Sequence, residues 1–336
     1  MKIKSIISLI TLLLIIGCNN NRLENEKEDI IVIIDSIFIP QEEIKELTAK
    51  DITLNKDIKF EKYLLDDEYP YNDTVRSFQW DKIKEKLAHI DNKVAKGGSW
   101  AIFSNYRNMN GEAPTVANFV RNEYKRVSDQ YGVERYQSVP LFTPDSDTTL
   151  TRYGRDGWLV KILDSDTTEM VKVSGVSFEG EYLIPQRYLV KWGDTISINK
   201  VAVVDVTNQN IAVIEKREDG WYILSMNPAT TGVHNPPYAL ETPVGVFAVQ
   251  EQKQKMYYTK DGSSELAGYA PFASRFTNGG YIHGVPVQYP RQSIIEWSPT
   301  LGTIPRSHMC VRNASSHSEF IYDWATVKET VVVVID

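Results

Sequence analysis

Apolar residues recur every three or four positions in residues 77–97, SFQWDKIKEKLAHIDNKVAKG. The recurring positions are Trp80, Ile83, Leu87, Ile90 and Val94. This spacing places the five side chains on one face of a helix. Gly97 and Gly98 then follow a lysine, which is a typical helix end. The pattern predicts an amphipathic helix here, and we expect a second helix from residue 115 to about 130.

Most of the remaining chain consists of short runs of β-forming residues. Short strands separated by Asp, Gly and Thr turns fill residues 131–193, which is typical of a small barrel or sandwich. Further strands run from residue 196 to the end, with one helix expected near 315–327. The predicted fold is therefore mainly β. It has an α-helical N-terminal part over residues 31–130, a small β-barrel-like domain over 131–193 and a β-rich C-terminal domain over 196–336.

The segment 1–17 has the features of a targeting sequence. Two lysines precede an apolar run from Ile6 to Ile16. Such a run is too short to cross a bilayer core of about 30 Å as a helix, so it predicts a secretory signal. The run ends in IIGC (15–18), which resembles the lipobox of bacterial lipoproteins. That resemblance implies that Cys18 is acylated and becomes the mature N-terminus.

Residues 18–30 are polar and charged, and we interpret them as a tether between the lipid and the folded part. The resemblance to lipoproteins implies a lipid-anchored protein of the cell envelope, on the periplasmic side. Asn19 stands where enterobacterial sorting signals for the inner membrane have aspartate. By that resemblance, the outer membrane is favoured over the inner membrane.

The chain is acidic. Its formal charge is −7, and removal of residues 1–17, which hold two lysines and no acidic residue, makes it more negative still. Nucleic acids bind clustered basic surfaces, so this balance excludes them as expected partners. The sequence carries no pattern that indicates an oligomeric state.

Cys310 is the one cysteine besides Cys18. An acylated Cys18 cannot form a disulfide with it, so an exported protein is left with a candidate reactive thiol. One cysteine and five histidines argue against a metal site. A histidine next to a thiol promotes its ionisation, and two are candidates. His308 is separated from Cys310 by Met309 alone, and His283 lies further upstream, in GGYIHG (279–284).

Several ordered motifs surround these residues. Thr231-Gly232 is followed by TPVGVF at 242–247, by His283-Gly284, and finally by SHMCVR at 307–312. Together they resemble the catalytic domain of L,D-transpeptidases of the YkuD type, and the resemblance covers the C-terminal domain predicted over 196–336. It implies a β-sandwich that acts on peptidoglycan stem peptides and needs no cofactor and no metal.

The resemblance also implies a role for each matched residue. Cys310 would be the nucleophile and His283 the general base, while Ser307 and His308 would line the site and support the thiolate. Backbone N–H groups of His308, Met309 and Cys310 would form the oxyanion hole. Gly284 and Arg312 are the remaining residues expected to line the substrate site. Two roles stay open for Arg312, which would either bind a substrate carboxylate or hold the loop by hydrogen bonds.

The implied reaction is a two-step acyl transfer. The thiolate attacks the carbonyl of the third residue of a stem tetrapeptide, and an amine of a neighbouring stem takes the acyl group to give a 3→3 cross-link. Two alternatives stay open at this point. Water as the acceptor would make the protein a hydrolase, and a lost active site would make it a non-catalytic wall-binding lipoprotein.

The sequence departs from the family pattern at two places. Met309 replaces the usual glycine, which is costly if the backbone there has a positive φ and acceptable if it is extended. The segment between His283 and Ser307 is longer than is usual in the family, so we expect an additional loop flanking the cleft. Residues 131–193 loosely resemble a bacterial Src-homology-3-like barrel. A supporting β subdomain is the equal alternative.

Overall fold

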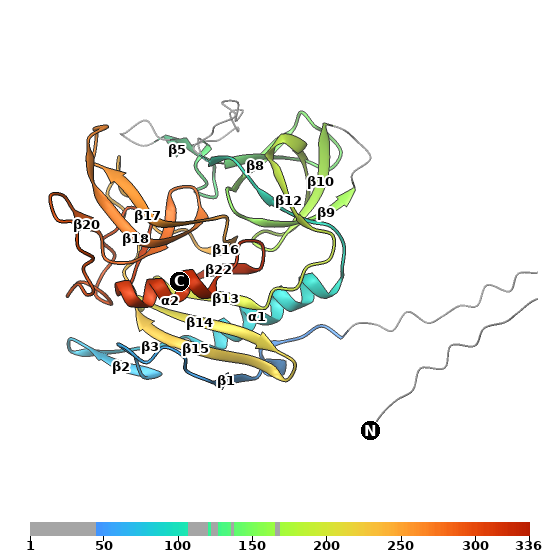
Figure 1. Cartoon of the computed structure of the whole chain (residues 1–336). Helices are drawn as coiled ribbons and strands as arrows, with labels where there is room; N and C mark the ends of the chain where they lie inside the picture. The colour runs from blue at the N-terminus through green and yellow to red at the C-terminus, as the bar shows by residue number, and fades with distance from the viewer. Residues whose placement is uncertain (1–44, 107–119, 122–126, 136–137, 165–168) are drawn as a thin grey trace, which may run out of the picture. The chain divides into compact units, whose positions relative to one another are not determined.

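Two β-sheets build the C-terminal part of the chain, as the computed structural model in Figure 1 shows. The structure describes residues 45–106, 120–121, 127–135, 138–164 and 169–336, all of which belong to one unit. The predicted signal, the lipidation site Cys18 and the tether lie outside the described residues. The first sheet has the order β1 (Leu54–Lys56), β15 (Gly220–Pro228), β14 (Asn210–Arg217), β13 (Lys200–Asp205), β22 (Thr330–Ile335) and β16 (Gly245–Ala248).

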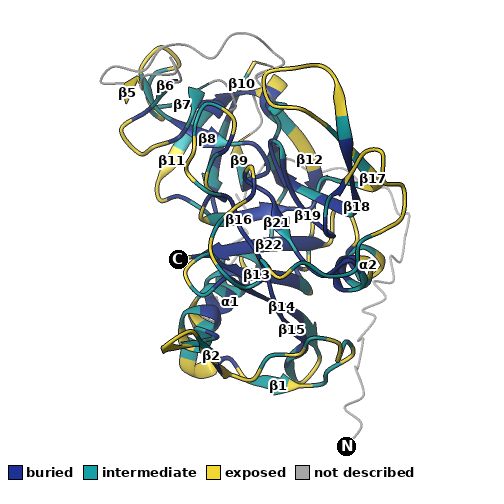
Figure 2. Cartoon of the chain, turned by 90° about the vertical axis from the view of Figure 1, so that its left-hand side faces the viewer, coloured by how far each residue is buried: buried dark blue, intermediate teal, exposed yellow. Residues whose placement is uncertain are grey.

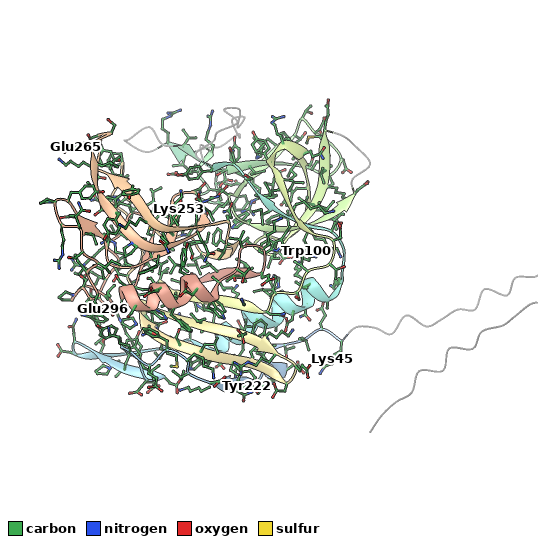
Figure 3. The ribbon with its side chains drawn as sticks, in the orientation of Figure 1. Lys45, Trp100, Tyr222, Lys253, Glu265 and Glu296 are labelled. Carbon is green, nitrogen blue, oxygen red and sulfur yellow. The ribbon has the colours of Figure 1, made fainter. Side chains whose placement is uncertain are left out.

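The second sheet carries the segments with the candidate catalytic motifs. It has the order β17 (Glu251–Thr259), β18 (Leu266–Thr277), β19 (Gly280–His283) and β21 (Val311–Arg312), and β20 (Val287–Gln288) pairs with β18. Strands β17 and β18 form a long hairpin. Figure 3 labels Glu265 near the tip of this hairpin and Lys253 closer to its base. The helix α2 (Ser315–Trp324) follows β21, which confirms the late helix expected near 315–327.

Strands β13 and β22 are neighbouring inner strands of the first sheet, and Figure 2 shows both as buried along most of their length. They pair in parallel, and both are near-continuous runs of valine and other apolar residues. Such runs are typical of strands covered on both faces. Val201 and Val203 face one apolar cluster, whereas Ala202 and Val204 face the other.

The helix α1 (Trp80–Ala95) covers one face of this sheet, which confirms the helix predicted over 77–97. Its buried positions Ile83, Leu87 and Ile90 pack in one cluster with strands β13, β14 and β22. The N-terminal region also adds strand β1, which pairs in parallel with β15. This region therefore contributes one strand and a covering helix to the first sheet.

A third sheet, the upstream sheet, has seven strands, which all lie within residues 100–193. Its order is β12 (Leu189–Gly193), β4 (Trp100–Phe103), β9 (Leu159–Asp164), β10 (Met170–Gly175), β11 (Glu181–Pro185), β7 (Ser138–Phe142) and β8 (Leu150–Arg155). Strand β4 precedes the predicted boundary at residue 131, so that boundary omits one strand of this sheet. The reason is that β4 gains its partners from distant β9 and β12, a pairing that local patterns do not reveal.

The second helix expected over residues 115–130 is wrong where the structure describes the chain. Residues 120–121 and 127–128 form the paired strands β5 (Val120–Arg121) and β6 (Val127–Ser128). Both strands begin with a β-branched valine, and the cross-strand pairing outweighs the local helical pattern. The remaining short elements are η1 (Ala49–Asp51), β2 (Glu68–Tyr71), β3 (Thr74–Ser77) and η4 (Gln186–Tyr188). No helix among the described residues is long and apolar enough to cross a membrane.

The substitution Leu87→Ala tests the packing of α1. Leu87 is fully buried under the helix, so we expect the free energy of unfolding in urea to fall by about 2–5 kcal/mol. The matched control Glu85→Ala lies on the exposed face of the same helix and is expected to change it by no more than about 0.5 kcal/mol. Equal effects of the two substitutions would contradict the packing described here.

Candidate active site

Cys310 lies directly before the short strand β21, which pairs in parallel with β19. The register aligns Ile282 with Val311 and His283 with Arg312. Side chains paired in this way lie on the same face of the sheet, and residues two apart along a strand share that face. The pairing therefore places Cys310 on the same face as His283. Cys310 also packs in one cluster with Tyr281 and Ala273.

The imidazole of His283 is buried and held by a neighbouring carbonyl. Its Nδ1 lies 2.6 Å from the carbonyl oxygen of Gly284. That oxygen can only accept, so Nδ1 carries the proton and Nε2 keeps its lone pair in the neutral ring. Burial lowers the pKa of His283 to about 4. The hydrogen bond to Gly284 raises this pKa and the nearby Arg312 charge lowers it, both by less than burial does. The ring is therefore neutral at pH 7 and able to accept a proton at Nε2.

The thiol of Cys310 is also buried and uncharged in this arrangement. Sγ donates to the carbonyl oxygen of Gly279 over 3.4 Å. Burial raises the pKa of the Cys310 thiol, and the opposing effects of the Tyr281 backbone and the Arg312 charge are smaller. A thiol in this state needs a base to become a nucleophile.

Backbone hydrogen bonds from residues 230–233 hold the chain on both sides of Cys310. On one side, Thr230 and Arg312 exchange N–H···O bonds of 2.9 and 2.8 Å. On the other side, the carbonyl of Thr231 accepts from the N–H of Ser307 at 3.0 Å. The N–H of Val233 then donates to the Ser307 carbonyl, also at 3.0 Å. The segment from Ser307 to Arg312 is thus held by hydrogen bonds at both ends, which limits its freedom to move.

The Thr-Gly and Thr-Pro motifs meet at the backbone of Met309. The N–H of Gly232 donates to Thr242 Oγ1, and this hydroxyl donates to the carbonyl of Met309, both over 2.8 Å. A Cβ atom on Gly232 would lie 2.7 Å from Met309 Cα and 2.3 Å from the Leu240 carbonyl oxygen. Only glycine therefore permits this close approach. Thr242 is a positioning residue that the sequence showed as part of a motif without indicating its contact.

Met309 has a φ of +79°, so the position keeps the left-handed conformation in which glycine is favoured. Of the two conformations considered from the sequence, the strained one is present. Within the described part of the chain, the N–H groups of His308, Met309 and Cys310 donate to no acceptor. Successive N–H groups in such a turn form a concave donor site for an anion.

A comparison with protein families assigns the C-terminal part of the chain. The family model of the L,D-transpeptidase catalytic domain, YkuD, matches residues 199–334. Residues 199–334 are an L,D-transpeptidase catalytic domain. The chain therefore contains a domain of this enzyme class.

Solved structures similar to this chain include three L,D-transpeptidases. One from Mycobacterium smegmatis has 19% identity and a TM-score of 0.34, with 53% of this chain and 82% of that chain covered. L,D-transpeptidase 3 from Mycobacterium tuberculosis has 17% identity and a TM-score of 0.33, with coverages of 56% and 72%. Residues 123–326 of one from Xylanimonas cellulosilytica have 22% identity and a TM-score of 0.29, with coverages of 41% and 61%. No curated protein sequence matches the chain.

Two residues predicted to support the thiolate of this L,D-transpeptidase domain have other contacts. The Ser307 hydroxyl is fully buried and donates to the carbonyl of Cys310, so it holds the loop and does not reach the sulfur. The side chain of His308 is 51% exposed, and its Nδ1 lies 3.6 Å from Asp261 Oδ1 in the turn of the β17–β18 hairpin. His308 thus contacts the hairpin, whereas His283 shares the face of Cys310.

Gly284 and Arg312 were expected to line the substrate site. The N–H of Gly284 donates to the Pro271 carbonyl, and a Cβ at Gly284 would lie 2.6 Å from Ser315 Oγ. Gly284 therefore orients His283 through its carbonyl and packs against α2. The guanidinium of Arg312 is largely buried, and its pKa is lowered by burial and raised less by the nearby Cys310 and Tyr258. Its charge acts on both His283 and Cys310.

The additional loop between His283 and Ser307 packs against neighbouring elements at several points. Ser315 Oγ donates to the Ile295 carbonyl at 2.7 Å, and Tyr258 donates to the Val287 carbonyl at 3.2 Å. A pocket of about 580 Å³ lies along this loop. Its lining residues are Pro286, Gln288, Tyr289, Pro290, Arg291 and Ile295. Among the residues described, no group of three or more His, Cys, Asp or Glu side chains is arranged to hold a metal ion.

A buried histidine that the sequence did not indicate supports the strand after Cys310. His317, on α2, has Nε2 2.9 Å from Ser225 Oγ and Nδ1 3.3 Å from Asn313 Oδ1. The N–H of Asn313 in turn donates to the His283 carbonyl at 3.0 Å. Burial lowers the pKa of His317 to about 3. The group is enclosed in the core, so it positions β21 and has no access to substrate.

The two buried histidines predict how stability depends on pH. Their folded-state pKa values of about 4 and about 3 lie below the ordinary 6.5, so the unfolded chain binds more protons below pH 6.5. The stability that these two neutral histidines contribute is complete above pH 6.5 and is lost as the pH falls below it. We expect the free energy of unfolding to decrease by up to about 1.4 kcal/mol for each histidine and each unit of falling pH, as measured by urea unfolding at pH 7 and pH 5. His317→Gln should reduce the slope by about half, and an unchanged slope would contradict this account.

The left-handed backbone at Met309 predicts an inverted order of two substitutions. Both Met309→Gly and Met309→Ala remove the buried side chain, but only alanine keeps the steric cost of a positive φ. We expect the glycine variant to be about 1 kcal/mol more stable by urea unfolding, although glycine is normally the less stable of the two. A more stable alanine variant would refute a positive φ at this position.

Proposed function

We propose that this chain is a peptidoglycan L,D-transpeptidase in which Cys310 is the nucleophile and His283 the general base. The observation that carries the proposal is the register of β19 with β21. It places the buried thiol on the same face as an imidazole whose Nε2 is free to accept a proton. Neutral thiol and neutral imidazole form a productive starting state for base-assisted attack.

The first half-reaction transfers an acyl group to sulfur. His283 Nε2 takes the proton of Cys310, and Sγ attacks the carbonyl carbon of the third, diamino acid residue of a stem tetrapeptide. The negative charge that develops on the carbonyl oxygen is stabilised by the N–H groups of residues 308–310. The C–N bond then breaks, the terminal D-amino acid leaves with the proton returned by His283, and a thioester remains on Cys310.

The second half-reaction releases the thioester. A side-chain amine of a neighbouring stem attacks the thioester carbonyl and gives a proton to His283. The C–S bond breaks, the new amide forms a 3→3 cross-link, and the Cys310 thiol takes back the proton. The thioester keeps the energy of the original peptide bond, so no nucleotide is required outside the cytoplasm.

The N-terminal segment supports a location for this activity. We propose that an acyl group on Cys18 anchors the protein in the cell envelope, facing the periplasm and in the outer membrane. Residues 18–30 would tether the enzyme near its polymeric substrate, which raises the effective concentration. Residues 131–193 would add a weak second contact to the cell wall.

Product analysis of a tetrapeptide muropeptide incubated with the protein tests the proposed reaction. We expect a 3→3 dimer from the unaltered chain, no product from Cys310→Ala, and a decrease in kcat of about 10²–10⁴-fold for His283→Asn. A carbapenem should add its mass to the peptide containing Cys310 and leave Cys310→Ala unmodified.

The products also discriminate between the proposed function and its alternatives. A released tripeptide without a dimer would mean that water is the acceptor and that the protein is a hydrolase. No adduct and no change in the muropeptide would instead favour a non-catalytic wall-binding lipoprotein. Either result would contradict the proposed transpeptidation.

A further inference from the structure

A buried carboxylate of the upstream sheet reaches into the catalytic domain. Asp156 follows strand β8 and is fully buried. Its Oδ2 accepts hydrogen bonds from Arg275 at 3.0 Å, Gln250 at 3.1 Å and the N–H of Asn278 at 2.8 Å, and its Oδ1 accepts from the N–H of Asn105 at 3.0 Å. Three of these four donors belong to the catalytic domain. A buried charge is tolerated only when it is paired and hydrogen-bonded in this way.

The turn between β18 and β19 is one part of the catalytic domain that Asp156 contacts. Besides the Asn278 N–H bond, Thr277 Oγ1 donates to the backbone carbonyl of Asp156 at 2.6 Å. A Cβ on Gly157 would lie 2.0 Å from the Phe276 carbonyl oxygen, so the two backbones are in direct contact. The turn is therefore fixed by the upstream sheet from outside the catalytic domain.

The same turn contacts the nucleophile. Gly279, which directly follows Asn278, provides the carbonyl that accepts the Cys310 thiol. A second path runs through side chains, because Arg275 lies 3.4 Å from Glu251 and Glu251 accepts from the Tyr281 hydroxyl at 3.1 Å. Tyr281 packs in the cluster that contains Cys310. Both paths lead from Asp156 to the thiol.

We propose that Asp156 is a positioning residue for Cys310, so that the upstream sheet fixes the geometry of the active site through the turn at residues 277–280. This inference rests on the proposed function in taking Cys310 as the nucleophile. It assigns the upstream sheet a role inside the catalytic unit that differs from contact with the cell wall.

The isosteric substitution Asp156→Asn removes this support while keeping the shape. Donors face both oxygens of Asp156, so an amide NH₂ group must point at a donor in either orientation, and Arg275 also loses one of its carboxylate partners. The matched control is Asp129→Asn. Asp129 is equally buried in the upstream part, but its partners are the N–H groups of Tyr131, Val133 and Tyr153, none of them in the catalytic domain.

The experiment compares two rates in the full-length chain. The first is alkylation of Cys310 by iodoacetamide as a function of pH, followed by the mass of the peptide that contains Cys310. For Asp156→Asn we expect faster alkylation with a midpoint at lower pH, because a loosened turn admits water to the thiol. The second is turnover of the tetrapeptide, for which we expect a decrease of about 10²-fold in kcat with little change in KM. Asp129→Asn should lower thermal stability with neither change.

A milder variant, Thr277→Val, tests the same role if Asp156→Asn does not fold. Thr277→Val removes only the hydroxyl that joins the turn to Asp156, and it should shift alkylation and kcat in the same directions by a smaller factor. Equal alkylation profiles for the Asp156, Thr277 and Asp129 variants and the unaltered chain would overturn the positioning role. An unaltered chain that forms no acyl-enzyme would overturn the proposed function, whereas the alkylation profiles would still decide the role of Asp156.

Discussion

The parallel pairing of β19 with β21 joins two segments that are distant in the sequence, Gly280–His283 and Val311–Arg312. Because side chains alternate along a strand, a shift of one residue would turn Cys310 away from the face that carries His283. Contacts on three sides prevent such a shift. Residues 230–233 hold the backbone before and after Cys310, Gly232 and Thr242 fix Met309, and Asn313 bonds to the His283 carbonyl. The register is therefore a property of several packed elements and not of two short strands alone.

Burial determines the electrostatics of the site that this pairing creates. The thiol and the imidazole are both held in their neutral forms, since desolvation raises one pKa and lowers the other. Arg312 favours the thiolate and opposes the imidazolium, so its charge does not by itself create a resting ion pair. Proton transfer is then expected to accompany attack on the substrate, when negative charge moves to an oxygen beside the free N–H groups of the loop.

Sequence patterns predicted those parts of the structure that depend on the spacing of neighbouring residues or that contain ordered motifs. The 3–4 spacing over 77–97 predicted α1, and the β-forming runs after residue 196 predicted strands, of which β13 and β22 are two. The motifs around His283 and Cys310 indicated the catalytic domain. Non-local pairing was not predictable, as β4 with its distant partners β9 and β12 shows. The contacts of His308 with Asp261 and of Asp156 with Asn278 also depend on where distant loops meet in the fold.

The central claim is that the loop at residues 307–310 presents its N–H groups to an acyl group on Cys310, although Met309 replaces glycine. A crystal structure of the chain acylated by a carbapenem measures this directly. We predict a thioester on Cys310 whose carbonyl oxygen lies about 2.7–3.1 Å from N–H groups of residues 308–310. We also predict that Met309 keeps its positive φ. A carbonyl oxygen that points away from this loop, or an extended backbone at Met309, would contradict the claim.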